Sequence, residues 1–205
     1  MRVRAVLILV TVSLVVSVSA QVPQGWKMRV DQSQDAQDPD DRPDLAFTTT
    51  NGGFHVKGGP AGVFWNPANT ASGSYTLQAS FRLNEPSSHT NFYGLVFGGS
   101  GLEGAAQRYT YFVVAQNGMY LVRQRNGDAV SDVQRRTMHE AVARPGPDGS
   151  STNVLEVRVA GDTVSFVVNG TVVHTAPKSG VTTDGMAGFR VNHVLDVTVQ
   201  GFEVS

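Results

Sequence analysis

Ten residues of the sequence have side chains suited to holding a polar organic ligand. Aromatic rings stack on the apolar faces of a ligand, and Arg, Asn and His form directional hydrogen bonds to its hydroxyl or carboxylate groups. These residues are His55, Trp65, Asn66, Tyr93, Tyr109, Tyr111, Arg123, Arg190, Asn192 and His193. They form no contiguous motif, so the elements that carry them decide whether they meet in one site.

The segment 58–75, GGPAGVFWNPANTASGSY, carries the largest of these aromatic side chains, Trp65. Successive strand residues point to opposite faces, so Phe64 and Trp65 cannot both face the same core. Asn66 and Pro67 are expected to end this strand, because proline has no N–H group to donate to a β-ladder. Trp65 is therefore expected at the rim of a sheet, where it either lines a ligand groove or packs as an ordinary core residue.

The segment GFRVNH places Arg190 and Asn192 on one strand face and Phe189 and Val191 on the other. Both polar side chains hydrogen-bond directionally to hydroxyls or carboxylates, which favours a pair that faces a ligand. A solvated strand face is the alternative interpretation of the same alternation.

Several kinds of reactive site are absent from the sequence. There is no cysteine, which excludes disulfides, thiolate metal sites and cysteine nucleophiles. The five histidines form neither a His-x-His nor a His-Glu-x-x-His spacing, and no serine lies in a Gly-x-Ser-x-Gly motif. No cofactor is therefore expected, with calcium as the one ion left open.

The calcium question arises from an acidic run, DQSQDAQDPDDRPD, over residues 31–44. Oxygen-rich loops bind calcium in many exported proteins, but this run lacks the spacing of an EF-hand loop and its bidentate glutamate. A solvated acidic loop is the alternative, and no metal ligand is assigned.

The first twenty residues, MRVRAVLILVTVSLVVSVSA, have the parts of a secretory signal peptide. Arg2 and Arg4 precede an apolar run that is shorter than the roughly 20 residues of a membrane-spanning helix. We expect cleavage between Ala20 and Gln21 and an exported mature chain without a membrane span, in a periplasm or released. The net charge changes from −1 to about −3 on cleavage, which gives no indication of a nucleic-acid partner.

The mature chain alternates apolar and polar residues with the period of a β-strand. The clearest strands are SYTLQASFRL (74–83), NVLEVRVA (153–160), DTVSFVV (162–168) and VLDVTVQGFEV (194–204). Gly161–Asp162 and Asn169–Gly170 are expected to form tight turns, and Gly201 a bulge. Residues 137–144, TMHEAVAR, form either one helical turn or a strand.

Two middle segments, NFYGLVFGG (91–99) and RYTYFVVAQNGMYLVR (108–123), are apolar on both faces. Their second face needs a cover, which is a second sheet, a partner chain or a ligand. Many short strands separated by turn signals predict an all-β fold, a two-sheet antiparallel sandwich. We expect a single domain over 21–205, with 21–44 as its polar acidic N-terminal segment.

The order of several motifs resembles one family of sandwiches. The motifs are GSYTLQASFRL, YGLVFGG, YTYFVVAQNGMYLVRQRNGD, NVLEVRVAGDTVSFVVNGTVVHT and GMAGFRVNHVLDVTVQGFEV. Over residues 26–205 the chain resembles the concanavalin A-like lectins and glucanases, in particular small exported bacterial domains related to family 16 glycoside hydrolase-like and laminin G-like modules. The resemblance implies a jelly-roll sandwich with one concave sheet, across which an oligo- or polysaccharide lies.

The sequence departs from the hydrolases of that family at the catalytic strand. The Glu-x-Asp-x-Glu triplet, which places two carboxylates on one face for a retaining mechanism, is absent. We therefore expect a non-catalytic carbohydrate-binding domain. One alternative is a glycoside hydrolase or lyase with another acid–base set, in which His55 or His193 carries the proton. Another is a structural or protein-interaction domain of the cell envelope. The oligomeric state is left open.

Overall fold

The computed structural model describes residues 22–31, 35, 38–42 and 44–205. The expected signal peptide and its cleavage site lie outside the described residues, as does part of the acidic run. The strands are β1 (Lys27–Asp31), β2 (Ala46–Thr50), β3 (Gly53–Gly58), β4 (Ala61–Ala71), β5 (Tyr75–Glu85), β6 (Phe92–Ser100), β7 (Arg108–Ala115), β8 (Met119–Asn126), β9 (Ala129–Met138), β10 (Ser151–Ala160), β11 (Thr163–Val168), β12 (Thr171–Pro177), β13 (Gly185–Val191) and β14 (Leu195–Val204). Two single turns of 3-10 helix, η1 (Pro39–Asp41) and η2 (Lys178–Gly180), complete the elements.

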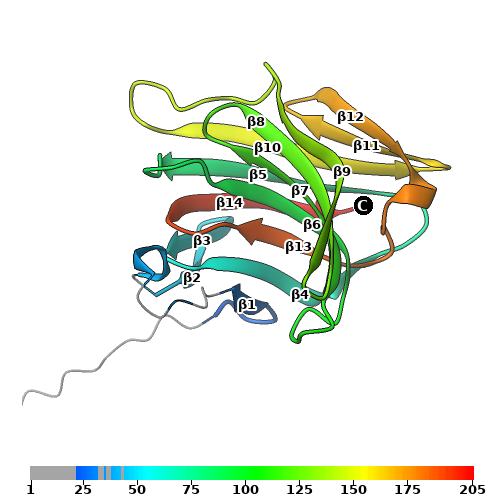
Figure 1. The fold of residues 1–205 in the computed structure, drawn as a ribbon, viewed down its shortest axis with the longest axis horizontal. Helices are drawn as coiled ribbons and strands as arrows, with labels where there is room; N and C mark the ends of the chain where they lie inside the picture. The colour runs from blue at the N-terminus through cyan, green and yellow to red at the C-terminus, as the bar shows by residue number, and fades with distance from the viewer. Residues whose placement is uncertain (1–21, 32–34, 36–37, 43) are drawn as a thin grey trace, which may run out of the picture.

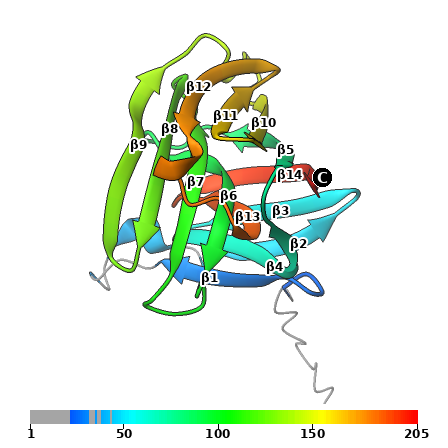
Figure 2. The ribbon, with the colours of Figure 1, turned by 90° about the vertical axis from the view of Figure 1, so that its right-hand side faces the viewer.

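The strands form two seven-stranded antiparallel sheets stacked as two layers (Figures 1 and 2). Sheet A has the order β1-β4-β13-β6-β7-β8-β9, and sheet B has the order β12-β11-β10-β5-β14-β3-β2. The predicted all-β, two-sheet antiparallel jelly-roll sandwich is confirmed. None of the helical turns in the described ranges has the length of apolar helix that a bilayer crossing requires.

The core lies between the sheets and follows the alternation of the sequence. In β5 the buried side chains are Tyr75, Leu77, Ala79, Phe81 and Leu83, and their neighbours are more exposed. Both expected tight turns are also present: Gly161 has a positive φ of 54° in the first, and Asn169 and Gly170 have positive φ of 49° and 81° in the second. The expected bulge at Gly201 is present as a register shift between β14 and β5.

Phe189 of β13 is the centre of the aromatic part of this core. It is fully buried. Its ring centroid lies between 5.1 and 6.4 Å from those of Trp26, Phe47, Phe54, Phe64, Phe81 and Phe202. These six rings come from both sheets and from the N-terminal segment, so Phe189 packs against parts of the chain that are far apart in sequence.

The expectation that Asn66 and Pro67 end a strand is wrong. Strand β4 continues through both residues to Ala71. Its pairing with β13 shifts between the Gly188–Trp65 and Met186–Thr70 pairs, which leaves Pro67 in a bulge where no ladder N–H is needed. The Asn66 side chain stabilises this bulge, because its Oδ1 accepts a hydrogen bond from the Ala68 N–H at 3.0 Å.

Residues 137–144 divide between two conformations. Strand β9 includes the first two and ends at Met138, and a turn follows. The Val142 N–H donates to the His139 carbonyl in that turn. The segment is thus the end of a strand followed by one hydrogen-bonded turn, and no helix is assigned to it.

Candidate ligand-binding face

Sheet A has a second apolar layer on the side away from the core. Phe64 and Phe189 point between the sheets, so the alternate residues of β4 and β13 point outward. The outward residues Val63, Trp65, Val96, Leu102 and Tyr109 form a separate buried cluster, with Tyr111 and Met186 at its edge. We call this side the outer face of sheet A, and it is the apolar second face that the sequence indicates for β6 and β7.

Trp65 lies on the outer face but is covered by protein. Its side chain is 1% exposed and packs with Leu102, from the glycine-rich connection between β6 and β7. An ion pair between Lys27 of β1 and Glu103 ties that connection to the sheet edge. Trp65 thus packs neither between the sheets nor in an open groove, although it contributes to the wall of a pocket of about 450 Å³ beside β1.

A buried ionic network crosses the outer face from β1 to β13. The Arg190 guanidinium donates through Nη1 to Asp31 Oδ2 at 2.7 Å and to the Tyr109 hydroxyl at 3.2 Å, and through Nε to Asn192 Oδ1 at 2.9 Å. Arg29 Nη2 lies 3.1 Å from the other oxygen of Asp31. The side chains of Arg190 and Asp31 are only 13% and 14% exposed.

Burial and charge act in opposite directions in this network. Burial alone would lower the pKa of Arg190, but Tyr109 and Asp31 beside it raise that pKa above its ordinary value. Burial raises the pKa of the Tyr109 phenol, against the opposing effect of Arg190. The guanidinium therefore stays charged and the phenol stays neutral, so the network is a fixed set of donors and acceptors.

Tyr111 is the aromatic side chain of this face that remains partly exposed. The Arg190 guanidinium carbon lies 5.9 Å from its ring centroid, and the Tyr109 ring lies 5.7 Å away. On the other side, Arg123 is its register partner in β8 and donates through Nε to Asp132 Oδ1 at 2.6 Å. A ring flanked by two guanidinium groups can stack on a ligand and hydrogen-bond its hydroxyls or carboxylates at once.

The structure thus gathers six of the ten candidate residues on or beside this face, namely Trp65, Tyr109, Tyr111, Arg123, Arg190 and Asn192. It also adds Arg29 and Asp132, which the sequence did not single out, and Asp31, which the sequence placed in the acidic run considered for calcium. The signal for Arg29 and Asp31 is the alternation of KMRVD, which reads as a strand with Lys27, Arg29 and Asp31 on one face. For Asp132 the register of β9 would have been needed.

The other four candidates lie elsewhere. Tyr93 is fully buried between the sheets, where its hydroxyl lies 3.4 Å from Asn153 Nδ2. Asn66 lies in the β4 bulge, and His193 lies in the connection between β13 and β14. His55 belongs to sheet B and pairs with Asp196 at 2.7 Å.

The Asp196 carboxylate beside His55 provides a pH-dependent prediction. Burial alone would raise the pKa of Asp196, but hydrogen bonds from Lys57, Asn84 and His55 lower it below its ordinary value of 3.8. A pKa that is lower in the folded state gives stability that is present above the unfolded pKa and lost as pH falls through the folded pKa. We expect Asp196→Asn to lower the free energy of unfolding by about 2 kcal/mol at pH 7.

Urea unfolding of both proteins from pH 7 down to pH 2.5 tests this prediction. The difference between them should narrow below pH 3.8, because the wild-type carboxylate then becomes neutral as well. A difference that stays constant over the whole range would contradict an ionic role for Asp196.

Comparisons with known proteins agree with the fold. No family model and no curated protein matches the chain. Among solved structures, it is similar to the carbohydrate-binding module CBM66 from Bacillus subtilis, with a TM-score of 0.62, 12% identity, and coverage of 88% of this chain and 95% of the other. It is also similar to the mixed linkage glucan PUL GH16 protein of Bacteroides ovatus (TM-score 0.57, 9% identity, coverage 88% and 94%) and to an endo-β-1,3-glucanase from Pyrococcus furiosus (0.54, 12%, 77% and 76%). The chain therefore has the concanavalin A-like lectin and glucanase fold.

Proposed function

We propose that the mature chain is an exported, non-catalytic domain that binds an oligo- or polysaccharide on the outer face of sheet A. The observation that carries the proposal is the partly exposed Tyr111 ring, which lies near the guanidinium of Arg190 and has Arg123 as its register partner on the neighbouring strand. The fold supports it as well, since a carbohydrate-binding module and glucanases share the same sandwich.

The chemistry of a sugar matches this arrangement. One face of a pyranose or furanose ring presents C–H groups that pack on an aromatic ring, and its rim presents hydroxyls. Arg123 and Arg190 supply donors, while Asp132 and Asn192 supply acceptors, so both halves of a hydroxyl group find partners. Because Arg190 is held by Asp31 and Asn192, its donors are fixed before the ligand arrives.

The carboxylates of the outer face support a non-catalytic role. Asp31 is paired with Arg29 and Arg190, and Asp132 with Arg123. Each of these carboxylates is thus engaged in an ion pair, whereas a glycoside hydrolase needs a carboxyl group that is free to donate a proton to the glycosidic oxygen. Export rests on the sequence of residues 1–20, and N-terminal sequencing of the exported product should begin at Gln21.

Binding should depend on Tyr111. We expect Tyr111→Ala and Arg123→Ala each to raise the Kd for a bound polysaccharide about tenfold, which is a loss of about 1.4 kcal/mol of binding free energy. A glycan array first identifies the ligand, and isothermal titration calorimetry then measures the Kd. Arg158→Ala is the matched control, because Arg158 also pairs with a carboxylate, Glu156, but lies on sheet B.

The outcomes separate the proposal from its alternatives. Equal losses of affinity in Arg123→Ala and Arg158→Ala would show that the binding site is not on the outer face of sheet A. Release of reducing sugar from a bound polysaccharide would instead identify a hydrolase. No binding to plant, algal or bacterial polysaccharides, together with an oligomer whose size depends on protein concentration in light scattering, would favour a protein-interaction domain.

A further inference from the structure

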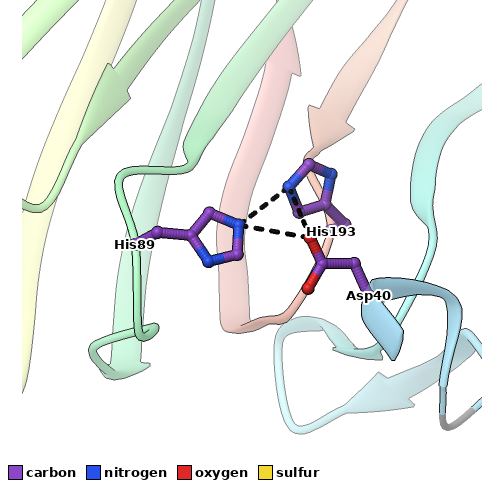
Figure 3. Close-up of side chains that lie close together, drawn as sticks. All are labelled: Asp40, His89 and His193. Carbon is purple, nitrogen blue, oxygen red and sulfur yellow. Dashed lines mark hydrogen bonds and ion pairs between the residues drawn. The ribbon is translucent and has the colours of Figure 1, made fainter. Parts of the chain in front are cut away.

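Three side chains from three separate parts of the chain meet at one end of the sandwich (Figure 3). Asp40 comes from η1, His89 from the connection between β5 and β6, and His193 from the connection between β13 and β14. The two histidine Nε2 atoms lie 3.1 Å apart. Asp40 Oδ2 lies 3.4 Å from the first and 3.5 Å from the second.

Two of these distances equal the separation expected between ligand atoms of a tetrahedral metal ion, and the third, between the two imidazole nitrogens, is slightly shorter. Zinc binds histidine nitrogen and carboxylate oxygen at about 2.0–2.2 Å, and tetrahedral geometry then separates neighbouring ligand atoms by about 3.3–3.5 Å. Two imidazole nitrogens and one carboxylate oxygen at 3.1–3.5 Å from one another therefore surround a position of the right size.

We propose that Asp40, His89 and His193 bind a divalent transition-metal ion, with Zn²⁺ as the best match. Imidazole suits zinc, copper and nickel, whereas calcium requires six to eight oxygen ligands. The proposed ion therefore differs from the calcium considered for the acidic run, of which this site uses only Asp40. The site uses none of the residues assigned to the proposed carbohydrate face, so the failure of either proposal leaves the other unchanged.

The backbone holds His193 from both sides. The Asn192 N–H donates to the Phe92 carbonyl and the Val194 N–H to the Gly59 carbonyl, so His193 lies between two fixed residues. Val194 has φ of 56°, a left-handed conformation that a β-branched residue adopts only where the surroundings impose it. This strained residue turns the chain directly after His193.

His89 and Asp40 also have supporting contacts. The Ser88 hydroxyl lies 3.1 Å from His89 Nδ1, which leaves Nε2 as the nitrogen that faces the other two ligands. Hydrogen bonds of this type to the second imidazole nitrogen orient metal-binding histidines. Asp40 is placed by η1, where the Asp38 side chain accepts a hydrogen bond from the Asp40 N–H at 2.9 Å.

The site has room for a fourth ligand. The three side chains are between 35% and 44% exposed, so an ion can reach them from solvent. Ser88 and Val194, which flank the two histidines, also line a pocket of about 290 Å³. A zinc site with three protein ligands keeps one position for water or a ligand oxygen.

Titration of the metal-free mature chain with ZnCl₂ in a calorimeter tests the site. We expect one Zn²⁺ per chain, a higher Tm with zinc that EDTA reverses, and no equivalent binding of CaCl₂. His89→Ala and His193→Ala should each weaken zinc binding at least 100-fold, and Asp40→Asn should weaken it less. His139→Ala is the control, because its imidazole lies outside the cluster and should leave binding unchanged.

A second measurement guards against variants that fail to fold. Co²⁺ bound to the wild-type chain should give the visible absorption of a tetrahedral site, and one equivalent of Zn²⁺ should remove it. The proposal would be overturned by an absence of zinc binding, by octahedral cobalt absorption alone, or by unchanged zinc affinity in folded His89→Ala and His193→Ala proteins.

Discussion

Phe189→Ala is expected to lower the free energy of unfolding by about 3–5 kcal/mol. Phe189 is fully buried and its ring contacts six other aromatic rings, so the substitution leaves a cavity bounded by rigid side chains. Its backbone pairs with β4 on one side and β6 on the other, which limits how far the surroundings can move to fill that cavity. Urea unfolding followed by fluorescence measures the loss.

Two control variants make this result specific. Phe189→Leu keeps most of the volume and should lose less than half as much stability as Phe189→Ala. Val130→Ala removes methyl groups from a side chain that is 45% exposed, so its change should stay within about 0.5 kcal/mol. If Phe189→Ala and Val130→Ala gave similar losses, the packing described for β13 would be incorrect.

Asp31→Asn is expected to lower the free energy of unfolding by about 3–5 kcal/mol. It removes the carboxylate of the ion cluster that Asp31 forms with Arg29 and Arg190. Arg190 lies 2.7 Å from one Asp31 oxygen and Arg29 lies 3.1 Å from the other. In the variant, the two guanidinium groups would stay close together on the outer face of sheet A without the carboxylate that pairs with both of them. The change is nearly isosteric, so the loss reports charge rather than volume.

Asp128→Asn provides the matched comparison. Asp128 also pairs with an arginine, Arg125, but at 3.9 Å and with a fully exposed carboxylate. An exposed ion pair contributes about 0–1 kcal/mol, so this variant should unfold almost as the wild type does. Urea unfolding at pH 7 measures both. A loss below about 1 kcal/mol for Asp31→Asn would show that solvent screens the cluster.

The sequence was sufficient for the fold class, because strict alternation in β5, β10, β11 and β14 determines which side chains face the core. It also showed that Phe64 and Trp65 point in opposite directions. The burial of Trp65 could not be predicted, because the residue that packs over it, Leu102, lies in a glycine-rich connection with no periodic pattern. The strand end predicted at Pro67 was wrong, because Pro67 lies in a bulge where the ladder does not need its missing N–H group.

The candidate site was less predictable for a reason of sequence distance. Alternation places Tyr93 and Tyr111 each on a strand face, but only the pairing of β6 with β7 shows that Tyr93 faces inward and Tyr111 outward. The Asp40–His89–His193 cluster joins residues that are 49 and 104 positions apart along the chain, so no local spacing could reveal it. The sequence indicated which side chains could bind, and the topology decided which of them meet.

The positions of β13 and β14 have a consequence for how the chain acquires its structure. Strand β13 lies between β4 and β6, and β14 lies between β5 and β3, so each joins two blocks of its sheet that are otherwise separate. Until residues 185–204 are available, β3, β4, β5 and β6 each keep an unpaired edge, which is a surface prone to association between chains. Neither sheet can be completed before residues 185–204 have been synthesised. We therefore expect slow folding, as in other proteins whose strand pairs are far apart in sequence.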